Sequence, residues 1–542
     1  MWLLSVNRSH DASICLSKDG EVVLHCLEER LTHLKNSQEV VYCLDMISSY
    51  TDTIDYLVVT NINEAYRDAH PFYIDSILKK NGVKVLHSVM SSSMHHSFHA
   101  ISGLMSSPFE KAICIIVDGA GSDLSHTSKE NETIVEVEIK DGVFAYQNLH
   151  KTVIGDDPRY PSVYGAGMSY NAITKHIGFK DLEDGKTMGL APYGVIDKKY
   201  VPLIDRNGAN PLCFKPFMHE HYGITALLYK DDLHADDLSF EEKATFAYKI
   251  QTDFEKYIYN LCKKAMQLSD CKNIVLSGGC FLNCVSNFKL IKRLPEDINL
   301  YVDPLCSDGG ISIGQSYVCN TELVGLSKEN NLSVKKYNPT YMGSSLVYDY
   351  QLKNDQHQEN TDPEKVAKLL AEGNIIAIAQ GRSETGPRSL GNRSILFDPR
   401  VKNGKELVNK VKKRESWRPF AGTVMLEYAK EWFDMNRLEE SPLMTYAIDT
   451  LPEKQNCISS IVHVDGTCRI QTVTKEQNKH YYNLISEFNN LTGTPIVLNT
   501  SFNLAGDTIV DTMEDALRTL EQSDIEYLYL PDIMKLIYVP NK

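Results

Sequence analysis

A glycine- and proline-rich loop between residues 381 and 394 carries three arginines. The apolar run 375–379 predicts a strand, and the loop after it reads Gly-Arg-Ser-Glu-Thr-Gly-Pro-Arg-Ser-Leu-Gly-Asn-Arg-Ser. Guanidinium groups bind phosphate oxygens in pairs. Arg382, Arg388 and Arg393, beside backbone N–H groups, therefore indicate a phosphorylated ligand. A solvated basic turn is the alternative.

Further cations follow this loop at a few predicted strand-to-loop junctions. They are Lys412, Arg414, Arg418 and Arg469. A polar run with Ser501 and Asn503 comes after the apolar segment 495–498, which predicts a buried strand. Cations gathered in this way in an acidic protein are what an anion-binding pocket needs.

A second set of residues could hold a metal ion. His95 and His99 are four residues apart, so on a helix they share one face. Such a pair could also cap or pack. Asp118 and Asp308 each follow a predicted strand, and two imidazoles with two carboxylates suit iron, manganese or zinc. His96 points about 100° away on the helix, which favours a supporting or substrate-contacting role.

Three predicted strands run into polar or glycine-rich turns, at residues 7–13, 118–121 and 277–283. The first contains His10 and Asp11, and the last contains Gly278, Gly279 and Asn283 before a predicted helix. A helix start after a glycine turn can bind phosphate. Together the three junctions match the layout of a duplicated actin/hexokinase-type fold.

Length and composition limit the alternatives. A chain of 542 residues is too long for one core, so we expect two to four domains. The net charge of −15 argues against a generally basic nucleic-acid surface. Thirteen cysteines without a C-x-x-C pair indicate reduced, intracellular thiols. No apolar run reaches membrane-spanning length, and the amino terminus predicts a strand rather than a signal peptide. We therefore expect a cytoplasmic protein.

The spacing of apolar residues predicts the main helices. Helices are expected over 240–268, 363–371 and 513–520, and a late strand over 527–530. Residues 325–365 are polar and contain the expected linker, and residues 196–236 are expected to be irregular. The charged segment 28–35 suits a solvated helix face as well as a functional one.

These stretches together resemble the O-carbamoyltransferases of the NodU/CmcH family. The matching motifs are Ser9-His-Asp-Ala-Ser13, Glu28-Glu-Arg30, His95-His-Ser-Phe-His99, Asp118-Gly-Ala-Gly121, Gly278-Gly279 with Asn283, Asp308-Gly-Gly310, Gly386-Pro-Arg-Ser-Leu-Gly-Asn-Arg-Ser394, Arg418-Pro-Phe-Ala421, His463-Val-Asp-Gly-Thr467 and Asn499-Thr-Ser-Phe-Asn503. The resemblance spans nearly the whole chain. Ser389 departs from the usual alanine, and Gly422 from the usual proline.

The resemblance implies an α/β protein with an ASKHA (actin/hexokinase-like) domain over 1–340 and a YrdC-like α/β domain over 345–542. It implies that carbamoyl phosphate and ATP, with Mg²⁺, give carbamoyl-adenylate, whose carbamoyl group passes to an acceptor hydroxyl. The carbamoyl phosphate and adenylate ligands would be Arg388, Arg393, Lys412, Arg414, Arg418, His463, Arg469, Ser501 and Asn503.

The same resemblance assigns the remaining roles. In the amino-terminal domain the nucleotide would lie at Gly278, Gly279 and Asn283. The metal, iron(II) with manganese or zinc as alternatives, would be held by His95, His99, Asp118 and Asp308. Arg388 and Lys412 would be catalytic. His10 and Asp11 are candidates for the base or for orienting the acceptor.

Several readings of the function stay open at this point. We expect a small hydroxylated molecule or sugar as the acceptor, and a hydroxymethylated cytosine in DNA or a nucleotide is the alternative. A sugar kinase would fit the first half of the chain alone, and a metal or nucleotide sensor is a third class. No membrane partner is expected, and a homodimer is left open.

Overall fold

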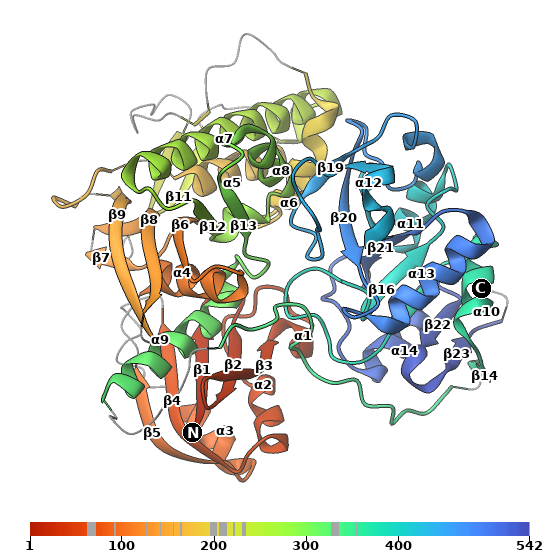
Figure 1. The fold of residues 1–542 in the computed structure, drawn as a ribbon, viewed down its shortest axis with the longest axis horizontal. Coiled ribbons are helices and arrows are strands. Elements are labelled where there is room, and N and C mark those ends of the chain that lie inside the picture. Colours follow the sequence, from red (N-terminus) through yellow and green to blue (C-terminus); the bar gives the residue numbers. More distant parts are fainter. Residues whose placement is uncertain are drawn as a thin grey trace. The chain divides into compact units, whose positions relative to one another are not determined.

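A computed structural model describes residues 1–61, 72–90, 94–125, 127–140, 142–155, 157–162, 165–195, 203–204, 214–219, 223–229, 235–326, 335–353 and 355–540. The chain divides into two compact units (Figure 1). The amino-terminal unit comprises Met1–Thr32 and Asn36–Asn338, and the carboxy-terminal unit comprises His33–Lys35 and Pro339–Lys542. In the part of the chain described, no helix is both long and apolar enough to cross a membrane.

The first sheet of the amino-terminal unit has the strand order β3-β2-β1-β4-β5. Its strands are β1 (Trp2–Arg8), β2 (Ser13–Lys18), β3 (Glu21–Leu27), β4 (Thr53–Asn61) and β5 (Lys84–Met90). Strands β1 to β3 pair antiparallel through short turns, whereas β1, β4 and β5 run parallel. The short helices α1 (Glu29–Thr32) and α2 (Tyr42–Asp45) and the helix α3 (Phe72–Lys80) belong to this half of the unit.

The second sheet repeats the same plan. Its strands are β6 (Lys111–Val117), β7 (Asp123–Ser125), β8 (Ser128–Lys140), β9 (Val143–Gly155), β12 (Asn273–Ser277) and β13 (Asn299–Val302). Strands β9, β8 and β6 are antiparallel, and β6, β12 and β13 are parallel. Two sheets with this one topology make the duplicated actin/hexokinase-like fold, so the fold predicted for this half is confirmed.

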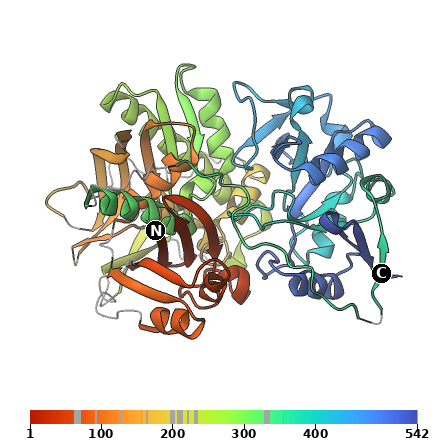
Figure 2. The same cartoon turned by 60° about the horizontal axis from the view of Figure 1, so that its bottom comes forward.

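Two helices lie between the sheets. Helix α9 (Ile311–Leu326) packs on β1 and β2 of the first sheet (Figures 1 and 2), and helix α4 (His95–Ser106) packs on β6 and β12 of the second. The helices also contact each other, and they cross at Gly314. A Cβ atom at that position would lie 2.0 Å from the carbonyl oxygen of Phe98. Only glycine therefore allows this approach.

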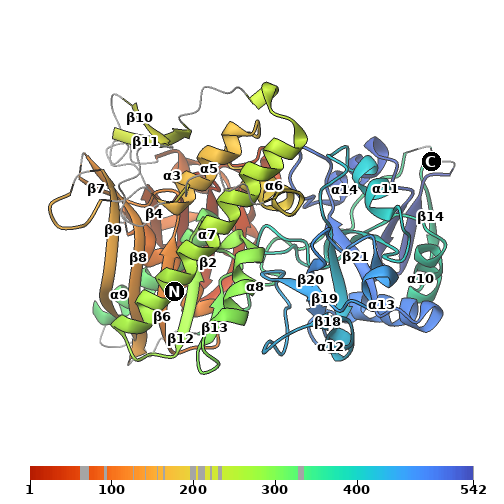
Figure 3. The same cartoon turned by 90° about the horizontal axis from the view of Figure 1, so that it is seen from above.

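Helix α7 (Phe240–Leu268) crosses the other face of the second sheet (Figure 3). It begins at a capping box formed by Ser239 and Glu242, and its apolar stripe includes Phe246, Ile250, Phe254 and Ile258. The helices packed against it are α5 (Ala166–His176), α6 (Asp184–Leu190) and α8 (Cys284–Arg293). The predicted bounds of this long helix agree with the structure.

The carboxy-terminal unit is built on one mixed sheet of ten strands, ordered β14-β23-β22-β15-β16-β21-β17-β20-β19-β18. The strands are β14 (His357–Asn360), β15 (Ile376–Ala379), β16 (Arg393–Phe397), β17 (Ala421–Met425), β18 (Phe433–Asp434), β19 (Ala447–Thr450), β20 (Thr467–Val473), β21 (Ile496–Ser501), β22 (Tyr527–Leu530) and β23 (Lys535–Tyr538). The helices are α10 (Pro363–Ala371), α11 (Gly404–Val411), α12 (Ala429–Trp432), α13 (Lys479–Thr492) and α14 (Met513–Gln522).

Successive side chains of β15 point into two different core clusters, one on each face of the sheet. Ile376 and Ile378 face a cluster that contains α10 and α13, whereas Ala377 and Ala379 face a cluster that contains α14. Because successive side chains of a strand point to opposite faces, the sheet is covered by helices on both sides. This is the α/β domain expected for the second half of the chain.

One sequence-based expectation about elements was wrong, and one alternative that the sequence left open is decided. Residues 196–236 are not wholly irregular, because β10 (Phe214–His219) and β11 (Gly223–Tyr229) form an antiparallel hairpin there. Nor is 28–35 a solvated helix face. Glu28 and Arg30 are buried, and the Glu28 carboxylate accepts hydrogen bonds from the backbone N–H groups of Tyr42 and Cys43.

Candidate metal centre and anion-binding cluster

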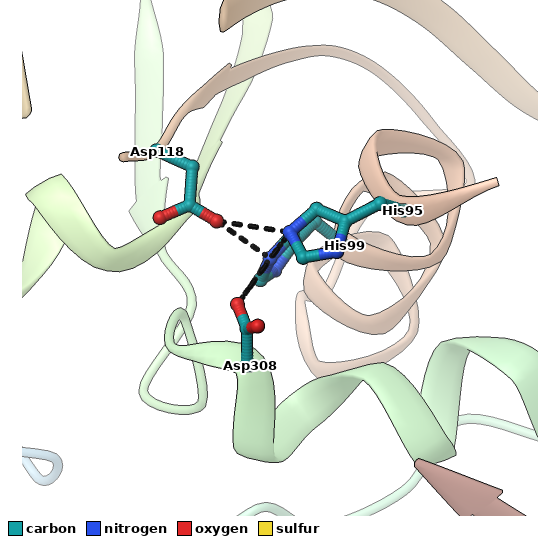
Figure 4. A group of neighbouring side chains, drawn as sticks. All are labelled: His95, His99, Asp118 and Asp308. Atoms are coloured by element: carbon teal, nitrogen blue, oxygen red, sulfur yellow. Dashed lines mark hydrogen bonds and ion pairs between the residues drawn. The ribbon is translucent and has the colours of Figure 1, made fainter. Parts of the chain in front are cut away.

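Four side chains from three parts of the amino-terminal unit converge on one point (Figure 4). His95 and His99 come from the first two turns of α4, Asp118 follows β6, and Asp308 stands at the start of the short 3-10 turn that leads into α9. All four are buried. The predicted residues are thus brought together by the helix spacing and by the carboxyl ends of two strands.

The distances suit a single metal ion. His95 Nε2 lies 2.9 Å from Asp118 Oδ2 and 3.2 Å from His99 Nε2. Asp308 Oδ1 lies 3.5 Å and 3.6 Å from the same two imidazole nitrogens. All four donor atoms lie within 4.8 Å of one another. Bonds of about 2.0–2.2 Å to a central ion would need donors at such separations. The residues present therefore fit a divalent metal.

Neighbouring groups hold these donors in place. The backbone N–H of Gly119 donates to Asp118 Oδ1 at 2.7 Å, which leaves Oδ2 for the centre. The side-chain amide of Asn7 donates to the backbone carbonyl of Asp308 at 2.9 Å. Behind His99, Ser277 Oγ lies 3.5 Å from Nδ1 and donates to Asp303 Oδ2 at 2.9 Å. Outer groups of this kind orient metal-binding histidines.

The carboxylates and imidazoles of this centre shift one another's pKa values. Burial alone would raise the pKa of the Asp118 carboxyl, but hydrogen bonds from His95 and His99 hold it well below its usual range. Burial opposes the charged form of His99, and hydrogen bonds to Asp118 and Asp308 nevertheless raise its pKa to about 9. In the metal-free protein the His99 imidazolium and the two carboxylates therefore stabilise each other as ion pairs.

His10 is the part of this centre that reaches solvent. Its Nε2 lies 3.5 Å from Asp308 Oδ2, its Nδ1 lies 3.8 Å from Asp11 Oδ2, and its side chain is 42% exposed. The charge of Asp308 is the main cause that raises the pKa of His10 to about 10. Of the two residues predicted for acceptor activation, His10 thus lies beside the candidate metal-binding set, and Asp11 lies beside His10. His96 is buried and bonded to Thr133 Oγ1 at 2.7 Å, away from solvent.

The Gly278-Gly279 turn lies next to the same centre. Gly278 has a φ of 100°, and a Cβ there would lie 2.3 Å from the backbone oxygen of Val117. A Cβ on Gly279 would lie 3.1 Å from Asp118 Oδ1. Asn283 caps α8 by accepting from Ser286 N, and its amide exchanges hydrogen bonds with Gln251. These contacts are structural, and nucleotide binding by this turn stays a prediction.

A second cluster gathers cations in the carboxy-terminal unit. Lys412 ends α11, and its ammonium donates to the backbone oxygens of Ser501 and Asn503 and to Asn503 Oδ1. Ser501 Oγ also donates to Asn503 Oδ1, at 2.6 Å. The structure therefore joins three of the predicted ligands. Burial, followed by the charges of Arg414 and Arg418, lowers the pKa of Lys412 well below its usual range.

Two arginines, Arg414 and Arg418, lie near this lysine, and a third, Arg469, lies near Arg414. Arg414 lies over the ring of Phe420, with 4.3 Å from its guanidinium carbon to the ring centroid. Burial and the charges of Arg418 and Arg469 lower the pKa of Arg414 well below its usual range. Arg469 extends from β20, where it pairs with Ala421. Cations that depress one another's pKa need an anion to balance them, and a phosphate would do so.

The arginine-rich loop divides into supporting and candidate binding residues. Arg393 was expected to bind the ligand, but it is fully buried and its guanidinium donates to backbone carbonyls of Gln380, Asn392 and Asp511. Arg382 donates to the carbonyls of Met342 and Gly343 in the same way. These contacts of Arg382 and Arg393 are structural, and ligand binding by Arg393 stays a prediction. Arg388 stands half-buried in the loop, and His463 is buried in a turn closed by its backbone.

Comparisons with known proteins match each of the two halves of the chain. The profile described as "Carbamoyltransferase N-terminus" matches residues 73–317, and the one described as "Carbamoyltransferase C-terminus" matches residues 367–536. The nodulation protein NolO of Bradyrhizobium diazoefficiens is 30% identical over 449 residues, which cover 80% of this chain and 77% of NolO. The chain belongs to the carbamoyltransferase family.

Other carbamoyltransferase relatives extend the comparison. The nodulation protein NolNO of Sinorhizobium fredii is 29% identical across 96% of this chain and 78% of its own length. The 3'-hydroxymethylcephem-O-carbamoyltransferase of Streptomyces clavuligerus is 30% identical across 48% of each chain. Family membership makes the protein a carbamoyl-transferring enzyme, and the resemblance inferred from the motifs is confirmed.

Sequence reasoning missed residues that support the two sites. Ser277 and Asp303 stand behind His99, and both lie in segments whose neighbours were recognised. Asn499 and Gln471 bond to the arginine-rich loop, donating to the carbonyls of Ser389 and Leu390. Ser277 and Asn499 are polar residues that follow a buried apolar run of a strand, and this position could have marked them as candidates.

Proposed function

We propose that this carbamoyltransferase joins carbamoyl phosphate and ATP into carbamoyl-adenylate and passes the carbamoyl group to the hydroxyl of a small molecule. The cation cluster carries the proposal. Lys412 and Arg414 are buried beside further guanidinium groups, and burial and these like charges lower the pKa of both. Two phosphorylated substrates would supply the missing negative charge.

In the first half-reaction, water displaces phosphate from carbamoyl phosphate to leave carbamate. A carbamate oxygen then attacks the α-phosphorus of ATP, and pyrophosphate leaves. Lys412, Arg414 and Arg469 are proposed to bind the phosphate oxygens, and Ser501 and Asn503 to orient the lysine and the adenylate. Fixed cations stabilise charge that develops on phosphoryl oxygens without reorganising.

In the second half-reaction, the acceptor oxygen attacks the carbamoyl carbon, AMP leaves, and the hydroxyl proton is lost. His95, His99, Asp118 and Asp308 would hold a divalent metal, iron(II) with manganese or zinc as the alternatives. That metal would supply Lewis acidity to the acceptor hydroxyl. His10 lies beside Asp308, Asp11 lies beside His10, and both partly reach solvent, so they are proposed to orient the acceptor or to take its proton.

Carbamoyl-phosphate-dependent ATP–pyrophosphate exchange tests the first half-reaction. The protein should exchange pyrophosphate only when ATP and carbamoyl phosphate are both present. Lys412→Ala should abolish exchange because it removes the buried cation. The matched control is Lys413→Ala, since the next lysine is exposed and donates to the backbone oxygen of Gln522 at 3.2 Å. Exchange without carbamoyl phosphate, or normal exchange by Lys412→Ala, would refute the proposal.

A further inference from the structure

One buried carboxylate organises the loop that carries Arg388. Glu384 is 3% exposed, and its Oε1 accepts three hydrogen bonds from backbone N–H groups of the loop. The donors are Leu390 at 2.8 Å, Asn392 at 2.9 Å and Arg393 at 3.1 Å. Hydrogen bonds to an ionised acceptor are stronger than those between neutral groups. An internal anion thus occupies a backbone site of the kind that binds external anions.

This arrangement corrects the reading of the loop as a phosphate-binding backbone. The sequence suggested that its N–H groups would face the ligand. Those of residues 390, 392 and 393 instead face Glu384. These three N–H groups are therefore not available to a ligand, and Arg388 is the candidate side chain of the loop for binding it.

The position of Glu384 is itself fixed from both sides. The backbone N–H of Ser383 donates to Ser344 O at 2.8 Å, and that of Thr385 donates to Thr340 O at 2.9 Å. The Thr385 hydroxyl also accepts from the N–H of Met342 at 2.8 Å. Glu384 thus extends from a segment paired with residues 340–344. Its carboxylate is a fixed point against which the loop folds.

The carbonyl groups of the loop are bound by other elements of the same unit. Asn499 Nδ2 donates to the Ser389 carbonyl at 3.2 Å, and Gln471 Nε2 donates to that of Leu390 at 2.8 Å. Gln380 Nε2 donates to the Gly391 carbonyl at 2.9 Å. The scaffold therefore holds the acceptors that follow Arg388, and Glu384 holds the donors. Removing the carboxylate would leave three buried N–H groups without an acceptor. The loop would have to move for these groups to find other partners.

We propose that Glu384 is a positioning residue that fixes the loop so that Arg388 presents its guanidinium to carbamoyl phosphate. The inference rests on the proposed function, because it takes Arg388 to bind carbamoyl phosphate during adenylate formation. Glu384 touches no substrate in this account. It acts only through the backbone conformation of residues 385–393.

The test compares Glu384→Ala and Glu384→Gln in the full-length protein. The amide of glutamine keeps an oxygen acceptor without the charge, so this conservative variant should restore much of the function that alanine loses. Asp398→Ala is the matched control. Asp398 is also buried and accepts a backbone N–H, that of Arg400 at 2.9 Å, but it lies outside the loop.

Two measurements read out the variants. Hydrogen exchange followed by mass spectrometry should show lost protection in peptides covering 385–394 in Glu384→Ala only. In pyrophosphate exchange, kcat/KM for carbamoyl phosphate should fall about 100-fold in Glu384→Ala, as expected when a reacting group is misplaced. Glu384→Gln should stay within about tenfold of the wild type. Asp398→Ala should keep the wild-type loop protection and kcat/KM even if its melting temperature falls.

Retained loop protection in Glu384→Ala, or an unchanged kcat/KM, would overturn the inference. Equal loss in Glu384→Gln and Asp398→Ala would also overturn it, because a general loss of stability would then explain the effect. If Glu384→Ala does not fold, Glu384→Gln is measured alone. Loop protection and kcat/KM within about tenfold of the wild type would then support the inference, and a larger loss of kcat/KM with full loop protection would overturn it. Absence of exchange in the wild type would instead refute the proposed function, and amide protection would still decide whether Glu384 holds the loop.

Discussion

Arg393 shows how burial gives a cation structural contacts that its place in the sequence does not reveal. It shares a loop with Arg388, and only the structure shows that its guanidinium is buried among backbone carbonyls. A buried arginine in such a place links the segments that supply those carbonyls, here Gln380, Asn392 and Asp511. Its removal leaves acceptors and a cavity inside the unit.

We therefore predict that Arg393→Lys lowers the free energy of unfolding by about 3 kcal/mol, because one ammonium cannot replace several directed N–H groups. Urea denaturation measures the change. The control is Arg159→Lys, since Arg159 is an exposed arginine paired with Asp157. Wild-type stability together with a raised KM for carbamoyl phosphate would show that Arg393 binds the ligand after all.

Residue types and spacing predicted the metal-binding set because each member follows a simple local rule. His95 and His99 are one helical turn apart, and Asp118 and Asp308 follow strands. Glu384 could not be found in this way. Its role depends on which backbone groups the folded loop turns toward it. In the sequence, a single glutamate among arginines suggests an ion pair with one of them.

At the scale of elements, the contact between α4 and α9 sets the geometry of the metal centre. α4 supplies His95 and His99, and Asp308 lies three residues before α9 begins. The helices cross where Gly314 faces the backbone of Phe98, with no room for a side chain. The separation of the donors therefore depends on a glycine that binds nothing itself.

Gly314→Ala should separate the helices and raise the dissociation constant for the metal at least about tenfold, as the loss of supporting contacts does at other metal sites. Titration of the metal-free protein with iron(II) or zinc measures this. Gly185→Ala is the control, because Gly185 lies in a helix with nothing within 4 Å of its added Cβ. Unchanged metal affinity in Gly314→Ala would show that the helix contact does not set the site.

The long strand β8 carries a buried acid that makes stability depend on pH. Burial raises the pKa of Glu132 to about 7 from 4.5, although Tyr257 and Thr152 donate hydrogen bonds to it. Between these pH values the folded protein keeps a proton that the unfolded chain releases. This contribution to stability is complete below pH 4.5 and is lost as the pH rises through 7.

Glu132→Gln should therefore remove part of the loss of stability between pH 5 and 7.5, up to about 3 kcal/mol for a shift of this size. Melting temperatures of the metal-free protein at several pH values measure the slope. Glu138→Gln, on the same strand but exposed, should keep the wild-type slope. The same slope in Glu132→Gln and the wild type would contradict the assignment.

Elements with regular periodicity were predictable, and those that depend on pairing were not. Helices 240–268 and 363–371 have the expected bounds because apolar spacing and capping residues define them. The hairpin of β10 and β11 was missed, as was the final strand β23. Both lie in hairpins, in which β11 follows β10 and β23 follows β22, but the strand preference of a residue depends on its packing context, which local patterns do not reveal.

At the scale of the molecule, the proposed function gives the two half-reactions to separate units of the chain. The cation cluster lies wholly within the carboxy-terminal unit, and the metal-binding set lies wholly within the amino-terminal unit. Each half-reaction should therefore be removable without the other. His99→Ala should lose metal and acceptor carbamoylation but keep pyrophosphate exchange, and Ser97→Ala on the same helix should keep both activities.

Mass spectrometry of complete reactions measures directly whether the protein makes carbamoyl-adenylate and carbamoylates a small acceptor. Protein, metal, ATP and carbamoyl phosphate would be incubated with aminoglycosides, sugar nucleotides, hydroxymethylcytidine nucleotides and DNA containing that base. We expect AMP, pyrophosphate and a small acceptor heavier by one carbamoyl group, with the acceptor product alone lost when the protein's metal is removed beforehand and only Mg²⁺ is supplied with the ATP. Phosphorylated acceptor, ADP, or carbamoylation that does not require ATP would contradict it.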